Sequence, residues 1–381
     1  MLARTEHWCA INSGTRNLAG VAAMADRLAD AFAALPGELR LVDAEPAEAV
    51  AADGSVAAIA HGRHLHLSVR PDAAVRLLLT GHMDTVYPVD HPFQSARWID
   101  ADTLNAPGAA DMKGGLSLML EALLALEVGG ADVGYEVVIN SDEETGSFSS
   151  AALLAQAARG KVAALTYEPA LPDGTLAGAR GGTGNFSIRV AGRSAHAGRN
   201  PQDGRNALVA AADLALRLDA IKGVGLAVNP AKIDGGGPNN VVPDHAVLRI
   251  NFRPVDADAI DRARHAIDAA VADVAAARDV AIDVHGSFNR PPKPIDAGAA
   301  RLFDLVKAAG ADLGQPIAWR ATGGVCDGNN IAACGVPVVD TIGVRGGAIH
   351  SPQEFMIIPS LAERAALSAL VLSRLSTGDL Q

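Results

Sequence analysis

Side chains that can bind a metal ion recur in short polar segments along the chain. They are two histidines and three carboxylates, in chain order His82, Asp111, Glu144, Glu168 and His350. A mixed set of nitrogen and oxygen donors suits zinc, with cobalt or manganese as alternatives. Five ligands are too many for one open catalytic ion, but they suit two ions about 3.5–4 Å apart if one carboxylate bridges them. The residue types therefore indicate a centre with two divalent ions per chain.

Two further carboxylates can support chemistry at such a centre. Neighbouring side chains of an extended segment point to opposite sides, so Glu143 can face a water while Glu144 binds metal. A carboxylate in that position can take the proton of the water and later deliver it to a leaving amine. Asp84 follows His82 by two residues and can accept its free ring N–H, although the spacing fits a simple turn residue equally well.

Each of these residues also has an ordinary structural interpretation. A single histidine after a strand is commonly a hydrogen-bonded polar residue, and an acidic residue in a glycine-rich loop commonly caps a helix or faces water. Asp111, for example, precedes the amphipathic stretch 112–127 and could be its N-cap. The joint pattern favours the metal site over these separate interpretations.

The metal ligands follow short apolar runs that predict buried parallel strands. These runs cover residues 75–80, 135–140, 162–167 and 336–342, and His82, the Glu143–Glu144 pair, Glu168 and His350 come after them in that order. Open α/β sheets bind ligands in the crevice outside the carboxyl ends of their strands. We therefore expect an α/β catalytic domain in which a central sheet, flanked by helices, brings these residues together.

The middle of the chain has a different pattern. Phe186, Ile188 and Val190 alternate with polar residues, and similar alternation recurs near 223–233, 246–253 and 280–284. Two helical stretches separate these strands, and the first is predicted to bury Leu208, Ala211, Ala212, Ala215 and Leu218. The order βαββαβ is that of a ferredoxin-like motif. We expect an inserted α+β domain at 180–292 between the two parts of the catalytic domain, 1–179 and 293–381.

Several of these segments resemble the M20 family of metallopeptidases over nearly the whole chain. His-Met-Asp-Thr-Val-Tyr (82–87), Asp-Glu-Glu-Thr-Gly-Ser (142–147) and Tyr-Glu-Pro (167–169) are most similar to its glutamate carboxypeptidase branch. The resemblance implies that His82 and Glu168 hold one zinc, that Glu144 and His350 hold the other, and that Asp111 bridges them. It also implies that Glu143 is the general base, that Asp84 orients His82, and that the peptide bond after Asp111 is cis.

The same resemblance gives roles to residues of the insert. His196 is expected to polarise the scissile carbonyl, often across a dimer interface, and Asn240 to bind substrate. Arg253 and Arg290 can grip a substrate carboxylate through a two-pronged hydrogen bond. Ordinary surface roles fit His196 and both arginines from sequence alone. The insert is accordingly expected to be a mobile lid and the contact of a homodimer.

Composition limits the remaining possibilities. The chain has 381 residues, 49% hydrophobic content and 32 basic against 43 acidic residues, for a net charge of −11, which argues against a nucleic-acid partner. No apolar run reaches membrane-spanning length, the first residues do not suggest a signal peptide, and three cysteines suit a reducing compartment. We expect a cytoplasmic protein without a membrane partner, and an incidental role for Cys326.

The expected activity is that of a dinuclear zinc hydrolase. It would cleave a peptide or N-acyl amide bond next to a free carboxylate in a small substrate, as a glutamate carboxypeptidase does. An N-acyl-amino-acid deacylase or a dipeptidase of the same family is the alternative, because the shared ligands do not separate these activities. A non-catalytic metal-binding protein of the same fold fits less well, since Glu143 and all five ligands are present. A nucleotide-binding protein lacks its glycine fingerprint.

Overall fold

The computed structural model describes residues 1–378 and has a six-stranded mixed sheet at its centre. The strands lie in the order β1 (Glu38–Val42), β4 (His64–Val69), β8 (Gly134–Asn140), β5 (Arg76–His82), β9 (Ala163–Thr166) and β18 (Val338–Val339). The strands from β8 to β18 run parallel to one another, whereas at one edge β4 is antiparallel to β8 and β1 is antiparallel to β4. All four predicted apolar runs thus form adjacent parallel strands, β8, β5, β9 and β18.

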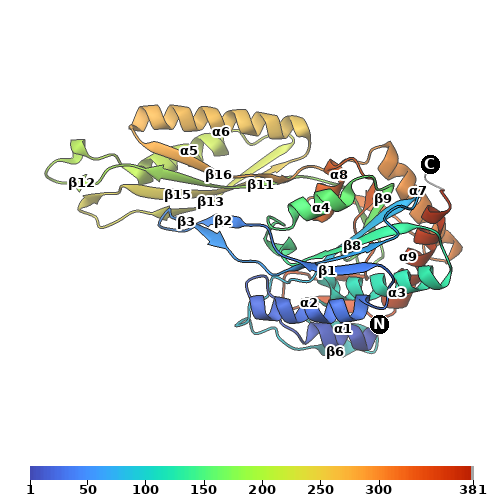
Figure 1. The fold of residues 1–381 in the computed structure, drawn as a ribbon. Coiled ribbons are helices and arrows are strands. Elements are labelled where there is room, and N and C mark those ends of the chain that lie inside the picture. Colours follow the sequence, from blue (N-terminus) through green and yellow to red (C-terminus); the bar gives the residue numbers. More distant parts are fainter. Residues whose placement is uncertain (379–381) are drawn as a thin grey trace.

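Helices cover both faces of this sheet (Figure 1). The larger core combines the sheet with α1 (Leu2–Cys9), α2 (Leu18–Phe32), α3 (Gly114–Val128), α7 (Ala297–Asp312) and α9 (Ser360–Ser376). The smaller core packs α4 (Ala151–Ala158) and α8 (Asp327–Ala333) on the other face. Leu77 and Leu79 belong to the larger core and Leu78 to the smaller one, since successive side chains of a strand point to opposite faces. The predicted α/β fold is confirmed.

A second sheet is formed by the segment that the sequence marks as an insert. Its strands lie in the order β13 (Leu226–Gly235), β15 (His245–Pro254), β11 (Thr183–Ala191) and β16 (Ala281–Arg290), all antiparallel to their neighbours. Helices α5 (Ala207–Asp219) and α6 (Ala257–Arg278) cover one face of it and enclose a separate hydrophobic core (Figure 1). The predicted βαββαβ order of elements is present, and the sheet has the arrangement of a ferredoxin-like motif.

The buried face of α5 differs from the predicted one. Ala211 and Leu218 are buried as expected, but Leu208 is 37% exposed and Ala212 also faces solvent. The side chain of Asn206 caps the helix by accepting a hydrogen bond from the backbone N–H of Val209. The residues that α5 buries are Ala207, Ala210, Ala211, Leu214 and Leu218. Because apolar residues surround most of this helix, its periodicity does not define one face.

Smaller elements complete the site and its surroundings. A four-stranded sheet joins β19 (Gly346–Gly347), β20 (Phe355–Ile357), β7 (Thr103–Asn105) and β6 (Arg97–Asp100). The paired short strands are β10 (Leu176–Arg180) with β17 (Trp319–Thr322), β12 (Ala195–His196) with β14 (Val241–Val242), and β2 (Ala47–Val50) with β3 (Val56–Ile59). None of the helices in residues 1–378 has the length and apolar character that a bilayer crossing requires.

Candidate metal centre and active site

The five candidate ligands meet at the carboxyl ends of the parallel strands. His82 is the last residue of β5, Glu144 follows β8 and Glu168 follows β9, and these three strands are neighbours in the sheet. Asp111 lies in the helical turn before α3, directly after β7, and His350 lies in the connection between β19 and β20. The small sheet that pairs β7 with β20 therefore brings Asp111 and His350 to the end of the large sheet.

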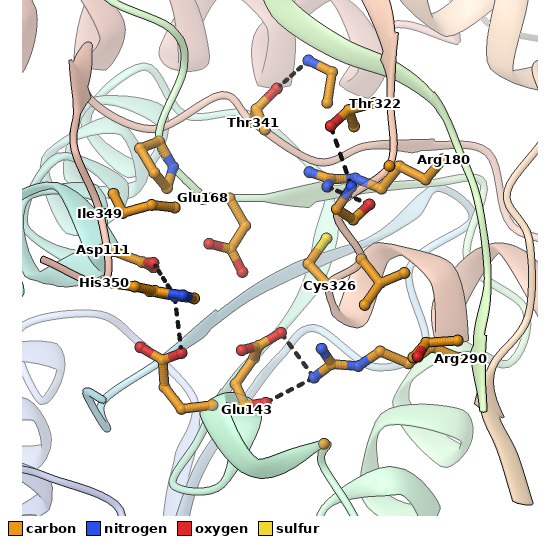
Figure 2. A pocket seen from close by; sticks show the side chains of 18 of the residues that line it. Asp111, Glu143, Glu168, Arg180, Arg290, Thr322, Cys326, Thr341, Ile349 and His350 are labelled. Carbon is orange, nitrogen blue, oxygen red and sulfur yellow. Dashed lines mark hydrogen bonds and ion pairs between the residues drawn. The ribbon is translucent and has the colours of Figure 1, made fainter. Parts of the chain in front are cut away.

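Asp111 lies between the two histidines. Its Oδ1 atom is 3.0 Å from Nε2 of His82. Its Oδ2 atom is 3.3 Å from Nε2 of His350 (Figure 2). On the outer sides, Glu168 Oε2 is 3.8 Å from His82 Nε2, and Glu144 Oε2 is 3.2 Å from His350 Nε2. Two histidine–glutamate pairs are thus joined by one aspartate, in the spatial order Glu168, His82, Asp111, His350, Glu144. Asp111 is not an N-cap, because α3 has no side-chain cap.

The donor set fits divalent cations. Ligand atoms of His82, Asp111 and Glu144 lie within 4.8 Å of one another, and those of His82, Glu143 and Glu168 do so as well. Burial and the nearby Asp111 carboxylate raise the pKa of Glu144 to about 8. Burial raises the pKa of Glu143 to about 7, although Arg290 opposes the shift. Such shifts arise where acidic groups are crowded away from water, and bound cations relieve that crowding.

Asp84 connects His82 to the segment that carries the two glutamates. Nδ1 of His82 lies 3.0 Å from the backbone oxygen of Asp84 and 3.4 Å from its Oδ1 atom. The Asp84 carboxylate also accepts hydrogen bonds from the backbone N–H groups of Glu143 and Glu144 and from the hydroxyl of Thr15. Asp84 therefore holds the ring mainly through its carbonyl group, while its carboxylate fixes the loop after β8.

Arg290 contacts Glu143 rather than open solvent. Its Nη2 atom lies 2.7 Å from Glu143 Oε1 and 2.8 Å from the Glu143 backbone oxygen (Figure 2). The same nitrogen is 2.9 Å from Ser147 Oγ. Asp327 lies 3.6 Å from the same nitrogen. Arg290 is 6% exposed, so the sequence alternative of a solvated surface arginine is wrong for this residue.

A cavity of about 840 Å³ opens beside the ligands. It is bounded by Asp111, Glu143, Glu144, Glu168 and His350, and by the arginines Arg180, Arg253, Arg290 and Arg320. Figure 2 shows Arg180 and Arg290 on one side of this space and Asp111 and His350 on the other. The cavity thus combines an acidic group that suits cations with a cationic group that suits a substrate carboxylate.

The arginines differ in how far their charge is already neutralised. Arg180 donates hydrogen bonds of 2.7 and 3.2 Å to the buried carboxylate of Asp340, and Arg290 pairs with Glu143. Among the residues that the structure describes, Arg253 donates only to the side-chain amide oxygen of Asn251. Within residues 1–378, Arg320 has no hydrogen bond or ion pair. Arg253 and Arg320 are therefore the two arginines of the cavity without a carboxylate bonded to them.

His196 and Asn240 do not border this cavity. His196 pairs with Val241 in the β12–β14 ribbon, and the backbone oxygen of Asn240 accepts a hydrogen bond from Ala197. The ribbon lies at the end of the insert that points away from the central sheet (Figure 1). The fold brings these two predicted substrate residues to each other, but not to the candidate metal ligands of their own chain.

Several buried polar residues around the site were not among the predicted ones. Arg180, Asp340 and Lys293 form a buried ion cluster, and Asp327 accepts hydrogen bonds from Ser147 and Asn140. Glu354 accepts hydrogen bonds from the Asp111 turn. Their partners are distant in the chain, so spacing gives no signal for them. The predicted cis peptide bond between Asp111 and Met112 is present.

Comparisons with known proteins agree with this geometry. Residues 78–374 match the sequence profile of peptidase family M20/M25/M40. Carboxypeptidase G2 of Pseudomonas sp. (strain RS-16) is 31% identical over 79% of this chain and 74% of its own length. Succinyl-diaminopimelate desuccinylase of Methylobacterium nodulans is 31% identical over 80% of this chain and 81% of its own length.

Solved structures share the fold. The aminopeptidase PepT of Bacillus cereus superposes with a TM-score of 0.73 at 22% identity, covering 98% of this chain and 97% of its own. A dinuclear metal-binding peptidase of Bacillus subtilis gives a TM-score of 0.65 at 15% identity, covering 98% and 96%. The profile match spans most of the chain and includes all five candidate ligands. The chain belongs to peptidase family M20/M25/M40, and it is a hydrolase of peptide or amide bonds.

Proposed function

We propose that the protein is a dinuclear zinc hydrolase that removes an amino acid with a free carboxylate from a small peptide or N-acyl substrate, in the manner of a glutamate carboxypeptidase. The observation that carries the proposal is the position of Asp111, whose two oxygens face His82 and His350 separately. A carboxylate in this position can bridge two ions. His82 and Glu168 are the proposed ligands of one ion, and His350 and Glu144 of the other.

Glu143 is the proposed general base. When bound, the divalent ions polarise the substrate carbonyl and lower the pKa of water. Glu143 borders the cavity beside the ligands, takes a proton from the attacking water and returns it to the leaving amine. Arg290 holds both the carboxylate and the backbone oxygen of Glu143, so the base keeps one orientation during these transfers.

Recognition of the substrate carboxylate is assigned to the cavity arginines. Arg253 is preferred over Arg290, because Nη2 of Arg290 already contacts Glu143 while Arg253 has no acidic partner. Arg320 supplies a second positive charge at the cavity, and no carboxylate is hydrogen-bonded to it in residues 1–378, although its charge helps to lower the pKa of Asp173. Two arginines without a hydrogen-bonded carboxylate suit an amino acid that carries a side-chain carboxylate in addition to its α-carboxylate. This charge pattern supports the glutamate-type substrate.

The insert at 180–292 is proposed to be a separate domain that acts as a lid and dimer contact. It has its own hydrophobic core, and it contributes Arg253 and Arg290 to the cavity. The outer face of α5 exposes Leu208, Val209 and Leu216, the last by 73%. An apolar face of this kind suits a contact with a second copy. In such a dimer, His196 of the partner subunit would reach the cavity, which the chain's own His196 does not border.

A deacylase of N-acyl amino acids is the second candidate, because the desuccinylase relative matches the chain over a similar length and identity. A hydrolysis screen of zinc-loaded protein tests both candidates. The substrates are folate-type glutamate conjugates, N-acetyl and N-succinyl amino acids, and dipeptides. Preferred hydrolysis of substrates with a C-terminal glutamate supports the glutamate carboxypeptidase. Hydrolysis that depends mainly on the acyl group supports the deacylase. Metal analysis of the same sample should approach two equivalents per chain, and one equivalent at saturating zinc would contradict the bridging role of Asp111.

A further inference from the structure

Glu354 is a buried carboxylate that the proposed mechanism does not use. It directly precedes β20, four residues after His350, and is 1% exposed. Its Oε1 atom accepts hydrogen bonds of 3.0 Å from the backbone N–H groups of both Ala110 and Asp111. Its Oε2 atom accepts one of 3.2 Å from the N–H of Gly108 and lies 2.8 Å from the Tyr87 hydroxyl. Four donors therefore converge on one carboxylate.

The backbone of the Asp111 turn is shaped to receive this anion. Gly108 has a φ of 74°, in the left-handed region that favours glycine. Consecutive backbone N–H groups at such a change of conformation form a concave site for a negative charge. A Cβ atom at position 108 would lie 2.9 Å from the side chain of Thr85, so a residue larger than glycine would disturb the turn. Glu354 occupies the concave site that this turn creates.

Glu354 also links segments that carry three of the five ligands. Tyr87 belongs to the segment that follows His82, and its hydroxyl lies 2.8 Å from the backbone oxygen of Ser351, next to His350. The backbone oxygen of Glu354 accepts a 2.6 Å hydrogen bond from Asn105, at the end of β7. Through its carboxylate and its backbone, Glu354 connects the segments of His82, Asp111 and His350.

We infer that Glu354 is a positioning residue for the bridging ligand: it fixes the backbone of the 108–111 turn so that the two oxygens of Asp111 face the two histidines. The inference rests on the proposed two-metal centre. A second carboxylate close to Asp111 adds negative charge to an already acidic site. The four hydrogen bonds that the Glu354 carboxylate accepts compensate the cost of burying its charge. A neutral side chain could not accept as many.

Glu354→Gln tests the inference, because the amide keeps the shape but turns one acceptor into a donor. Its NH₂ group would then face either the Gly108 N–H or the N–H groups of Ala110 and Asp111. Zinc titrated into metal-free protein should show affinity weakened about 10- to 100-fold for at least one ion, the usual effect of removing a group that orients a ligand. At limiting zinc kcat should fall, and it should recover with added zinc while KM stays unchanged.

Glu127→Gln is the matched control. Glu127 likewise accepts a hydrogen bond from a tyrosine, at 2.9 Å from the Tyr135 hydroxyl, and it also pairs with Arg70. It lies at the end of α3, near the start of β8, and therefore at the opposite end of that strand from Glu143. Its replacement should lower the Tm and leave both zinc affinities unchanged. Tyr87→Phe, with Tyr135→Phe as its control, gives a second comparison if Glu354→Gln does not fold.

The outcomes separate the inference from the proposed function. If the wild-type protein binds two ions and the Glu354→Gln variant binds them with equal affinity, the inference is overturned and the proposed function is not. A lower Tm of the metal-free variant with unchanged zinc affinities has the same meaning, since it reveals only a structural role. If Glu354→Gln does not fold, unchanged zinc affinity in Tyr87→Phe overturns the inference. Wild-type protein that binds no divalent ion removes both the proposed centre and the inference.

Discussion

The Nη2 atom of Arg290 lies 2.7 Å from Oε1 of Glu143 and 2.8 Å from its backbone oxygen. Arg290 ends β16 of the insert, whereas Glu143 follows β8 of the central sheet. The contact therefore joins the two sheets at the residue proposed to move the proton. Any movement of the insert relative to the central sheet acts on the general base directly. This gives the proposed lid a chemical role besides the exclusion of water.

The first prediction concerns the two arginines that sequence alone could not tell apart. Arg290→Lys should lower kcat to a similar extent for carboxylate substrates and for their amides, because Arg290 acts through Glu143. Arg253→Gln should raise KM for carboxylate substrates and change KM little for amides. Lysine is chosen at 290 because removing one partner of a buried ion pair costs about 3–5 kcal/mol. Steady-state kinetics with each carboxylate substrate and its amide checks both expectations. If Arg290→Lys instead raises KM for carboxylate substrates alone, Arg290 and not Arg253 binds the substrate carboxylate.

The second prediction concerns the base itself. Glu143→Gln should retain both metal ions and lose about 10²–10⁴-fold in kcat, since an amide cannot accept the proton of the water. Zinc titration separates this loss from metal loss. Glu144→Gln is the comparison, because it should weaken binding of one ion. Near-normal turnover of Glu143→Gln would require another base.

The third prediction is a pH dependence of the metal-free protein. The pKa of Glu144 is raised by burial from 4.5 to about 8, and that of Glu143 from 4.5 to about 7. At pH values between the ordinary and the raised pKa, the folded protein binds more protons than the unfolded chain. The free energy of unfolding should therefore fall as pH rises from about 5 to 8. The raised pKa of His350 acts in the same direction above its ordinary value of 6.5. Buried His64, with a lowered pKa, opposes the trend only below 6.5.

Urea unfolding at several pH values measures this slope. Glu144→Gln should flatten it, because the substituted side chain does not titrate. Saturating zinc should also flatten it, since the ligands then stay deprotonated. A metal-free protein that gains stability from pH 5 to 8 would show that the acidic cluster is already neutralised by other groups.

The fourth prediction addresses the dimer. His196→Ala and Glu143→Gln should each be poorly active alone, and a mixture that has exchanged subunits should recover activity. In a mixed dimer, one cavity has an intact Glu143 and receives His196 of the partner subunit. Sedimentation verifies the dimer, and Leu216→Glu on the outer face of α5 should dissociate it. A monomeric protein of full activity, or a mixture without recovery, would mean that His196 does not act across subunits.

The sequence by itself identified the candidate ligands and their general position. Short apolar runs that end shortly before His82, Glu143 and Glu168 became β5, β8 and β9. Because the carboxyl ends of adjacent parallel strands meet at one edge, that local pattern was sufficient to gather these residues. The alternation of the insert likewise predicted its half-buried strands, since each strand buries one face on the same two helices.

Only the tertiary structure decided which polar groups face one another. Arg290 and Glu143 are distant in the chain, as are Glu354 and Gly108, and their contacts depend on how whole sheets are joined. Side-chain periodicity also fails where most of a helix is apolar, so only the packing of α5 in the core of the insert identifies its buried face. Strand-end ligands are specified by local sequence, whereas the groups that orient them are specified by long-range packing.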